Sequence, residues 1–379
     1  MSASPVLTAD VAVIGAGPAG AIAALNLAPF RRVLVIDKGG ASAARIGENL
    51  PAAAGRLLRD MGLYDAFVAQ GHAPSRYLRS AWGGAQLADA DAIRNLDGPG
   101  WHLDRPRFDA WLREEASRRG AAIVADTAVR GIERSGGPDG TWQLDLLRAG
   151  RPVAARARLV IDASGRRAVL GRRLGGGREP LDRLVCGWIF GTDAGSSTGN
   201  GGDANELHAE PGGWWYTASL PDRGRVLAFY TDADLPDAGS AHSRDALLAR
   251  LAAMPELAEM VGRLDACGFR PDGAYGFCAA HTATQAAVAG EAWLAVGDAA
   301  LAFDPLSSQG LFNALYTGLA GADAVYRHDV EGVPSALDAY RQHIDGIRDA
   351  YLRNLSACYR METRWADRPF WRRRGEGGG

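Results

Sequence analysis

Three glycines near the N-terminus form a motif whose chemistry is the binding of a diphosphate. Gly15, Gly17 and Gly20 follow an apolar run at 10–14 and open a run of small residues at 18–28, which predicts a strand, a tight turn and a helix. The first glycine permits the turn, the second lets a diphosphate approach the backbone, and the third lets helix and strand pack closely. The amino end of a helix favours such an anion. The alternative is a glycine-rich turn in an unrelated α/β fold.

A carboxylate stands where the ribose of a dinucleotide would lie. Asp37 ends a second predicted strand at 32–37. A carboxylate at this point accepts a hydrogen bond from a ribose 2′-hydroxyl. Lys38 follows it and is expected beside the adenosine ribose, and Ala19, inside the glycine motif, is expected to contact the cofactor. These residues together predict a dinucleotide site.

Two later segments favour FAD over NAD. Residues 159–165 form a predicted strand that ends in small residues, and a buried strand at 292–297 is followed by Asp298. The chain has returned to the nucleotide fold at this point, so Asp298 could bond a ribityl hydroxyl, which FAD has and NAD lacks. The alternative for Asp298 is a helix N-cap or a turn residue.

At these positions the sequence resembles the FAD-dependent aromatic monooxygenase superfamily, over nearly the whole chain. A finer resemblance, to flavin-dependent halogenases and their halogenase-like relatives, is carried by Gly-Glu-Asn-Leu-Pro at 47–51, by the segment 101–109 and by the loop 297–311. The resemblance implies that FAD is the cofactor and that these three segments lie around it.

The same resemblance implies roles for individual residues. Arg105 is expected to reach the FAD phosphates, Arg45 to contact FAD, and Pro305 to belong to the flavin-facing loop. The N–H groups of Gly310 and Leu311 would begin a helix beneath the flavin pyrimidine. Donors in that position stabilise negative charge on the reduced ring, as in an oxyanion hole.

The sequence departs from true halogenases in three places. Residues 65–100 lack the lysine that halogenases use in catalysis, Ser307 replaces a glutamate, and a Trp-x-Tyr pattern at 214–216 replaces Trp-x-Trp. The chain's single lysine, Lys38, is expected at the far end of FAD from the substrate. Halogenation is therefore not expected.

The hydroxylating branch remains, and its nearest resemblance is to flavoprotein maturases of quinone-cofactor amine oxidases and dehydrogenases, which oxygenate a tryptophan within a protein or peptide. The segments 101–105, 359–365 and 370–373 carry this resemblance. It implies a monooxygenase that hydroxylates an electron-rich aromatic ring through a flavin C4a-hydroperoxide, with O₂ and with electrons from NAD(P)H or a separate flavin reductase. The alternatives are a small-molecule aromatic hydroxylase of a natural-product pathway, a geranylgeranyl-reductase-like flavin reductase, and a non-catalytic flavoprotein.

Four residues are candidates for contact with the substrate. Strand alternation places Trp214 and Tyr216 on one face and Trp215 on the other, so one face could line an aromatic pocket. His72 could act as a general base toward a ring N–H or a phenol. Glu48 follows the second strand near the expected edge of the flavin. The alternatives are core packing for the aromatic residues, a structural histidine, and an acid that satisfies a helix dipole.

Composition excludes several classes of protein. Lys+Arg 42 against Asp+Glu 44 gives a net charge of −2, which argues against a nucleic-acid protein held by phosphate contacts. The four cysteines include no C-x-x-C pair, so neither a structural metal nor a disulfide framework is expected. Glycines and a proline interrupt the uncharged stretch 11–27, which predicts strand, turn and helix rather than a membrane span. The chain is expected to be cytoplasmic, without stable membrane insertion.

The pattern of predicted elements indicates an α/β protein with a Rossmann-like FAD-binding lobe, an inserted antiparallel β-sheet substrate lobe and a C-terminal helical segment. Residues 47–70 are expected to be helical, and one helix is expected over 335–365. The expected division is an FAD lobe at 1–75, 100–185 and 286–334, a substrate lobe at 76–99 and 186–285, a C-terminal helical segment at 335–371 and a disordered tail at 372–379.

Overall fold

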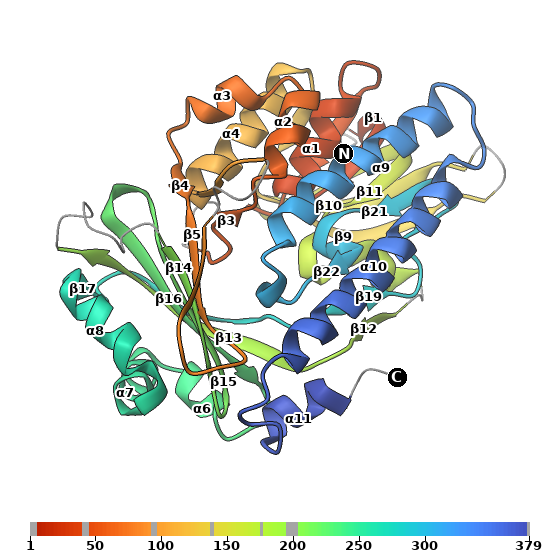
Figure 1. Ribbon diagram of the computed structural model, residues 1–379. Coiled ribbons are helices and arrows are strands. Elements are labelled where there is room, and N and C mark those ends of the chain that lie inside the picture. The colour runs from red at the N-terminus through yellow and green to blue at the C-terminus, as the bar shows by residue number, and fades with distance from the viewer. Residues whose placement is uncertain are drawn as a thin grey trace.

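Two large sheets organise the molecule (Figure 1). The computed structural model describes residues 6–39, 45–91, 97–136, 140–174, 177–194 and 204–376. One sheet is mainly parallel and carries the helices at the top of Figure 1, and the other is mainly antiparallel and lies at the lower left. The predicted α/β class, with a Rossmann-like sheet, an antiparallel sheet and C-terminal helices, is confirmed.

The parallel sheet has β1 at its centre. Its main path runs β20-β21-β11-β1-β2-β8, and β10 and β9 extend it in antiparallel fashion from β11. The central strands are buried on both faces and are rich in Val, Ile, Leu and Ala, as sheets covered by helices require. The strands are β1 (Val6–Ile14), β2 (Val33–Ile36), β8 (Ala122–Val124), β9 (Thr127–Arg134), β10 (Trp142–Arg148), β11 (Arg151–Asp162), β20 (Ala289–Gly290) and β21 (Trp293–Ala295).

Helix α1 (Pro18–Leu27) is made of small residues because it packs closely against its neighbours. An added Cβ at Gly318 of α9 (Gly310–Asp329) would approach the Ala19 carbonyl oxygen to 2.5 Å, so the two helices touch backbone to backbone. The other helices of this lobe are α2 (Ala54–Asp60), α3 (Tyr64–Val68), α4 (Arg105–Arg118) and α5 (Val169–Arg173).

The antiparallel sheet separates two layers of side chains. Its path runs β17-β13-β16-β15-β14-β5-β6, with β18 also paired to β13, and α6 to α8 cover its outer face (Figure 1). Trp215 packs in the cluster under those helices, whereas Trp214 packs in the cluster on the opposite face. The elements are β5 (Tyr77–Ala81), β6 (Ala88–Asp91), β13 (Leu184–Asp193), β14 (Ala204–Glu210), β15 (Gly213–Ser219), β16 (Gly224–Asp232), β17 (Phe269–Arg270), β18 (Tyr275–Ala279), α6 (Ala238–Ala241), α7 (Arg244–Ala253) and α8 (Ala258–Ala266).

The expectation of one helical stretch over 47–70 is wrong. The segment begins with a buried strand that pairs Leu50 with Trp101, and two short helices follow it. Gly62, with φ +67°, separates those helices, since this left-handed conformation suits glycine. The strand belongs to one of two small sheets, formed by β3 (Asn49–Leu50), β4 (Ala73–Ser75) and β7 (Gly100–His102), and by β12 (Arg178–Pro180), β19 (Ala283–Gln285) and β22 (Leu301–Ala302).

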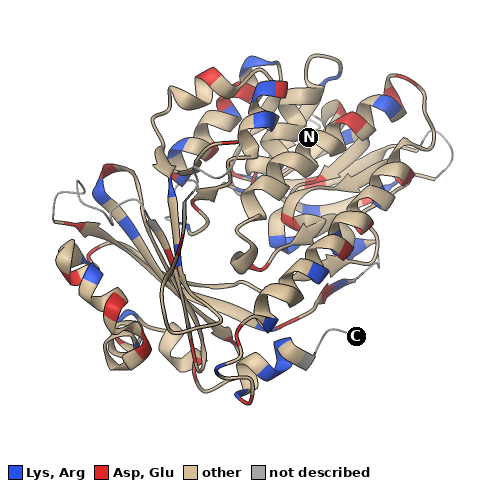
Figure 2. Ribbon diagram, in the orientation of Figure 1, with Lys and Arg blue, Asp and Glu red and all other residues tan. Residues whose placement is uncertain are grey.

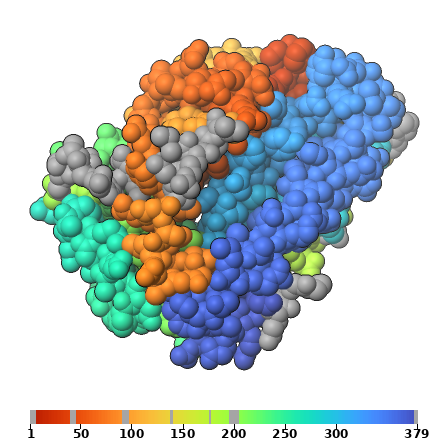
Figure 3. Space-filling view, in the orientation of Figure 1, coloured from red at the N-terminus to blue at the C-terminus, as the bar shows by residue number. Residues whose placement is uncertain are grey.

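The C-terminal segment joins the two lobes. Helix α10 (Ala336–Arg360) runs from the parallel-sheet layers toward the antiparallel sheet (Figure 1). In Figure 3 the segment carrying β5 and β6 lies against the C-terminal helices, where Trp82 Nε1 donates to the Cys358 carbonyl at 2.8 Å and Gly83 N donates to Glu362 at 2.9 Å. These contacts fix the inserted sheet relative to α10.

Two expectations about the C-terminus are wrong. The helix expected over 335–365 ends at Arg360, and residues 372–376 of the tail expected to be disordered over 372–379 are helical, in α11 (Pro369–Glu376). Residues 377–379 lie outside the described residues. The physical reason is long-range pairing. Arg374 donates to the buried carboxylate of Asp232 at 2.7 Å, and its guanidinium lies over the Phe370 ring.

Charges are dispersed over both lobes. Figure 2 shows Lys/Arg and Asp/Glu interspersed along the described elements, in keeping with the net charge of −2. Within the described ranges, no helix is long and apolar enough to cross a membrane.

The Arg374–Asp232 pair predicts that α11 contributes to stability. The side chain of Arg374 is 9% exposed and that of Asp232 is 2% exposed, so Arg374→Met leaves a buried carboxylate with only Arg373 beside it. We expect a loss of about 3 kcal/mol in the free energy of unfolding, measured by urea denaturation. The matched control is Arg372→Met on the exposed side of the same helix, where a change within about 0.5 kcal/mol is expected. Equal stabilities of the two variants would contradict the role given to α11.

Candidate active site

A large cavity lies between the two lobes. Its volume is about 1620 Å³, and it is lined by the glycine motif, the ends of β1 and β2, the start of α9 and the inner face of the antiparallel sheet. Ligands of open α/β sheets bind outside the carboxyl ends of the parallel strands. The cavity exceeds the roughly 300–1,000 Å³ of an ordinary ligand pocket, so it can take a dinucleotide and a second molecule.

The glycine motif forms the floor at one end of the cavity. Gly15 has φ +105°, and an added Cβ there would overlap the Ala163 carbonyl oxygen, while an added Cβ at Gly20 would overlap the Gly15 carbonyl oxygen. Gly17 is different, because a Cβ there meets nothing within 4 Å and would project into the cavity. Gly17 is the N-cap of α1, so the amino end of that helix opens onto the cavity. A diphosphate fits this arrangement.

Asp37 fixes the turn as well as facing the cavity. Its Oδ2 accepts from Ala16 N at 2.7 Å and its Oδ1 accepts from Gly39 N at 2.8 Å. A carboxylate has further lone pairs, so these bonds leave Asp37 able to accept from a ribose hydroxyl. Lys38 and Ala19 also line the cavity, and their contacts with the cofactor stay predictions.

Arg105 lies in the cavity wall, but most of its donors are engaged. Its guanidinium donates to the Gly47 carbonyl at 2.6 Å and to both oxygens of Asp109 at 3.2 and 3.3 Å. Arg45 also lines the cavity, is half exposed and lies 3.4 Å from Asp109. Arg105 therefore positions the 45–51 segment, and Arg45 is the more available cation for a phosphate.

A second helix terminus meets the cavity beside Asp298. Gly310 begins the 20-residue helix α9, a Cβ there would meet nothing within 4 Å, and Leu311 and Pro305 line the same wall. The Asp298 carboxylate lies 3.7 Å from Arg166. The amino ends of α1 and α9 thus both open onto the cavity, and the residues present fit FAD.

The opposite wall is aromatic. Trp214 on β15 and Tyr230 on β16 are register partners, and their rings stack with centroids 3.8 Å apart and planes 12° apart. Trp214 Nε1 lies 3.3 Å from the Tyr359 hydroxyl, which accepts its hydrogen bond. Tyr216 and Trp188 extend the same wall along the sheet. Strand alternation sends these rings inward, as expected for Trp214 and Tyr216.

A buried polar network borders this wall. Glu48 is 2% exposed and accepts from Gly47 N at 2.9 Å. Burial, and then the charge of Glu48, raise the pKa of Tyr216 well above its usual range, so the phenol stays protonated. The Tyr216 hydroxyl donates to Asn205 Oδ1 at 3.1 Å, and His102 Nε2 lies 2.7 Å from the same oxygen. Sequence reasoning missed Asn205 and His102, because nothing local marks either of them as polar partners.

His72 does not line the cavity, so the structure gives no support for its predicted role as general base. It packs against Phe67 and Phe108, with ring centroids 5.3 and 5.9 Å away, and its Nδ1 accepts from Asp104 N at 3.3 Å. Burial, reinforced by the charge of Arg107, lowers the pKa of His72 to about 4. His72 is thus a neutral core histidine at physiological pH.

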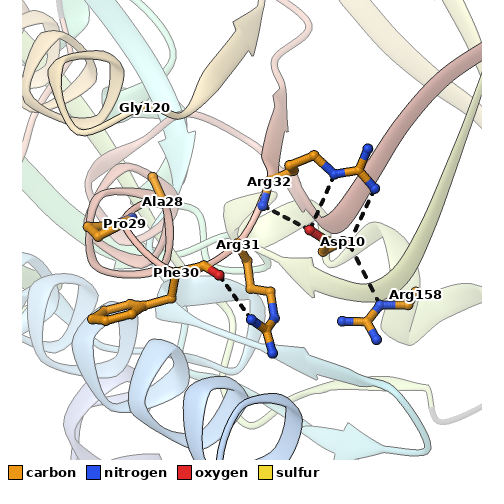
Figure 4. Close-up of a pocket in the computed structure, with 8 residues that line it drawn as sticks. All are labelled: Asp10, Ala28, Pro29, Phe30, Arg31, Arg32, Gly120 and Arg158. Atoms are coloured by element: carbon orange, nitrogen blue, oxygen red, sulfur yellow. Dashed lines mark hydrogen bonds and ion pairs between the residues drawn. The ribbon is translucent and has the colours of Figure 1, made fainter.

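A smaller pocket of about 700 Å³ lies apart from the large cavity, beside β1 and the end of α1 (Figure 4). Asp10 accepts from Arg32 N at 3.0 Å and lies 3.8 Å from Arg158, while Arg31 donates to Asp329 at 2.5 Å. Each of these arginines already has a carboxylate partner, so we assign no ligand to this pocket. Among the described residues, no group of three or more His, Cys, Asp or Glu is placed to hold a metal ion.

The chain matches a known family over its first half. The family model described as FAD binding domain matches residues 8–197. A putative FAD-dependent oxidoreductase of Marinomonas mediterranea, LodB, is 28% identical over 375 residues, which cover 96% of each chain.

Two solved structures share the whole architecture. The myxobacterial chondrochloren halogenase CndH superposes with a TM-score of 0.86 at 22% identity, over 97% of this chain and 86% of that one. The peptidyl tryptophan dihydroxylase QhpG, described as essential for tryptophylquinone cofactor biogenesis, superposes with a TM-score of 0.73 at 25% identity, over 97% of this chain and 78% of that one. The likeness to CndH shows a shared fold alone.

The open space at Gly17 predicts a specific effect on FAD binding. Gly17→Leu keeps an allowed backbone, with φ −71°, but places a side chain where the diphosphate would approach the α1 terminus. We expect normal folding and a roughly tenfold or greater loss of FAD affinity, since hydrogen bonds to a charged group contribute about 1.5–3 kcal/mol. The control is Gly346→Leu in α10, which also has open space and lies outside the cavity wall. Flavin titration by fluorescence quenching measures both, and an unchanged affinity in Gly17→Leu would refute this placement.

Proposed function

The chain belongs to the FAD binding domain family and is an FAD-dependent oxidoreductase, and from that premise we propose that it hydroxylates the indole of a tryptophan held in a peptide or protein. The observation that carries the proposal is the aromatic wall of Trp214, Tyr230 and Tyr216, which faces the same cavity as the two helix amino ends. The similarity to a peptidyl tryptophan dihydroxylase supports it.

The chain's own groups would hold FAD along one side of the cavity. Gly17 and the α1 terminus would receive the diphosphate, Asp37 the adenosine ribose, Asp298 the ribityl chain, and Gly310 with Leu311 the flavin ring. FAD, when bound, supplies the redox chemistry with O₂ and a reductant, NAD(P)H or a partner flavin reductase. The protein orients the substrate and excludes water.

The aromatic wall would orient the ring to be hydroxylated. Trp214 is held by its stack on Tyr230 and by its hydrogen bond to Tyr359, so the orientation of its ring is fixed. Trp214 and Tyr230 are buried, and Tyr216 is the more accessible ring of this wall. An aromatic pair contributes about 0.5–1.5 kcal/mol beyond the burial of its area. An indole sandwiched between this wall and the flavin side of the cavity would have its edge toward Glu48 and Tyr216.

In the proposed function Glu48, rather than His72, is the general base. Its carboxylate is buried in the cavity wall, and the neighbouring Tyr216 phenol stays protonated. A carboxylate there can accept an indole N–H and hold the ring in register, and it can take up a proton as the ring is oxygenated. The hydrogen bond from Tyr216 to Asn205 holds the phenol beside it.

The cavity rim favours a large substrate over a free amino acid. Tyr77 and Leu78 of β5 line the opening and are 43% and 44% exposed. Apolar side chains at a rim provide contacts for residues that flank a tryptophan in a peptide.

The substrate class is testable by mass spectrometry. With protein, FAD, NADH, a flavin reductase and O₂, a peptide that contains tryptophan should gain oxygen, while free tryptophan should react slowly. No halogen should enter the product when bromide is added, because the only lysine, Lys38, follows β2 at the nucleotide end of the cavity. If free tryptophan or a small phenol reacts as fast as every peptide tested, the peptidyl substrate is wrong and a small-molecule hydroxylase stands. Reduction of a polyprenyl double bond instead would refute hydroxylation.

The two candidate bases can be separated by matched variants. Glu48→Gln keeps the size of the side chain and removes its charge, so kcat for oxygenation should fall roughly 10²-fold, as general-base losses do. His72→Gln should retain most of kcat because His72 does not line the cavity. Flavin content reports folding in both variants. A larger loss of kcat in His72→Gln than in Glu48→Gln would restore the histidine as the base.

A further inference from the structure

Two cysteines face each other across neighbouring strands in the cavity wall. Cys186 of β13 and Cys278 of β18 are direct register partners in an antiparallel pair, and both line the cavity. Opposite residues in such a pair have Cα atoms about 4.5–5.5 Å apart. A disulfide spans Cα separations of about 4.4–6.8 Å, so the strands already meet its main geometric requirement. Both thiols are free in the structure.

The two thiols have different surroundings. Cys186 is fully buried, whereas Cys278 is half buried on the edge strand β18 and faces the charge of Arg166. A hydrogen bond from the Cys186 thiol, against the effect of burial, lowers the pKa of Cys278 to about 7, and burial raises the pKa of Cys186. Cys278 is therefore the nucleophile of the pair, and Cys186 is the thiol that resolves it.

The pair also touches the aromatic wall. Tyr230 is the register partner of Cys186 on its other side, and the two side chains share a hydrogen bond. Tyr230 in turn stacks on Trp214. The four neighbouring strands β18, β13, β16 and β15 thus carry one row of side chains. The row consists of Cys278, Cys186, Tyr230 and Trp214.

We propose that Cys186 and Cys278 form a reversible dithiol–disulfide pair that consumes hydrogen peroxide inside the cavity. A reduced flavoprotein that meets O₂ without its substrate releases hydrogen peroxide, so the oxidant would arise next to the pair. A cysteine thiolate reacts with hydrogen peroxide more readily than an indole or a phenol does, so the pair would remove the peroxide before it reaches the aromatic wall.

The reaction is balanced in two steps. The Cys278 thiolate attacks one peroxide oxygen, the O–O bond breaks, and hydroxide leaves and takes up a proton, which gives a sulfenic acid and water. The sulfur of Cys186 then attacks the sulfur of Cys278, the S–O bond breaks, and a second water leaves with the Cys186 proton. The two sulfurs supply two electrons to one peroxide and are joined in a disulfide, which an added dithiol reduces again.

The chain provides its own internal controls. Cys358 is exposed, and Cys267 lies on the far side of the sheet, beside Asp193 at 3.4 Å. If exposure alone decided reactivity, Cys358 would be oxidised first. If Cys186 and Cys278 form the proposed pair, they are oxidised before Cys358.

The test treats the FAD-loaded, oxidised protein with one equivalent of hydrogen peroxide, without reductant or substrate. The number of free thiols should fall from four to two, and peptide mapping should find Cys186 linked to Cys278. Dithiothreitol should restore both thiols. Oxidation of Cys358 with Cys186 and Cys278 left free would overturn the proposal.

Two variants sharpen the assignment of roles. Cys186→Ser should leave Cys278 as a sulfenic acid that dimedone traps, and the double variant Cys267→Ser, Cys358→Ser should form the disulfide as the wild type does. If dimedone does not label Cys278 in the Cys186→Ser protein, the assignment of Cys278 as the nucleophile is wrong. These readouts need no turnover, so they stand or fall separately from the proposed hydroxylation.

Discussion

The backbone contact between the glycine motif and β11 is the constraint on which the rest of the site depends. Gly15 lies so close to the Ala163 carbonyl, and Gly20 so close to the Gly15 carbonyl, that neither position has room for a side chain. This contact brings the ends of β1 and β11 and the start of α1 to one point. Gly17 is then left facing open space. The point where we propose that the diphosphate binds is therefore made from main-chain groups.

The aromatic end of the cavity, where we propose that the substrate binds, depends on side chains that connect distant parts of the chain. The Tyr359 hydroxyl donates to Asp304 Oδ2 at 2.7 Å and accepts from Trp214 Nε1. The Tyr351 hydroxyl accepts from Asp304 N at 2.7 Å and lies 2.7 Å from Thr282 Oγ1. Burial raises the pKa of Asp304 to about 6. One helix, α10, thereby holds both the loop before α9 and the aromatic wall.

What the sequence could predict follows from the range of the interactions. The glycine motif, Asp37 and the alternation at Trp214 are local patterns, and the structure places those residues along the cavity. The helix α11 depends on Arg374 meeting Asp232, and the pair of Cys186 with Cys278 depends on strand register. Contacts between residues so far apart in the chain leave no periodic signal, which is also why His72 could not be distinguished from a catalytic histidine.

The division between the two ends explains why a shared fold does not determine the reaction. Main-chain groups such as those at the starts of α1 and α9 place few demands on side chains, so one fold can hold a cofactor and support different reactions. In the proposed function the antiparallel sheet selects the substrate, because alternate residues of its strands face the cavity. In this chain that sheet carries Trp214 and Tyr216, with Glu48 beside them, and it carries no lysine. A wall of rings with the Glu48 carboxylate beside it suits the proposed aromatic substrate, which would be oriented by stacking and by its N–H group.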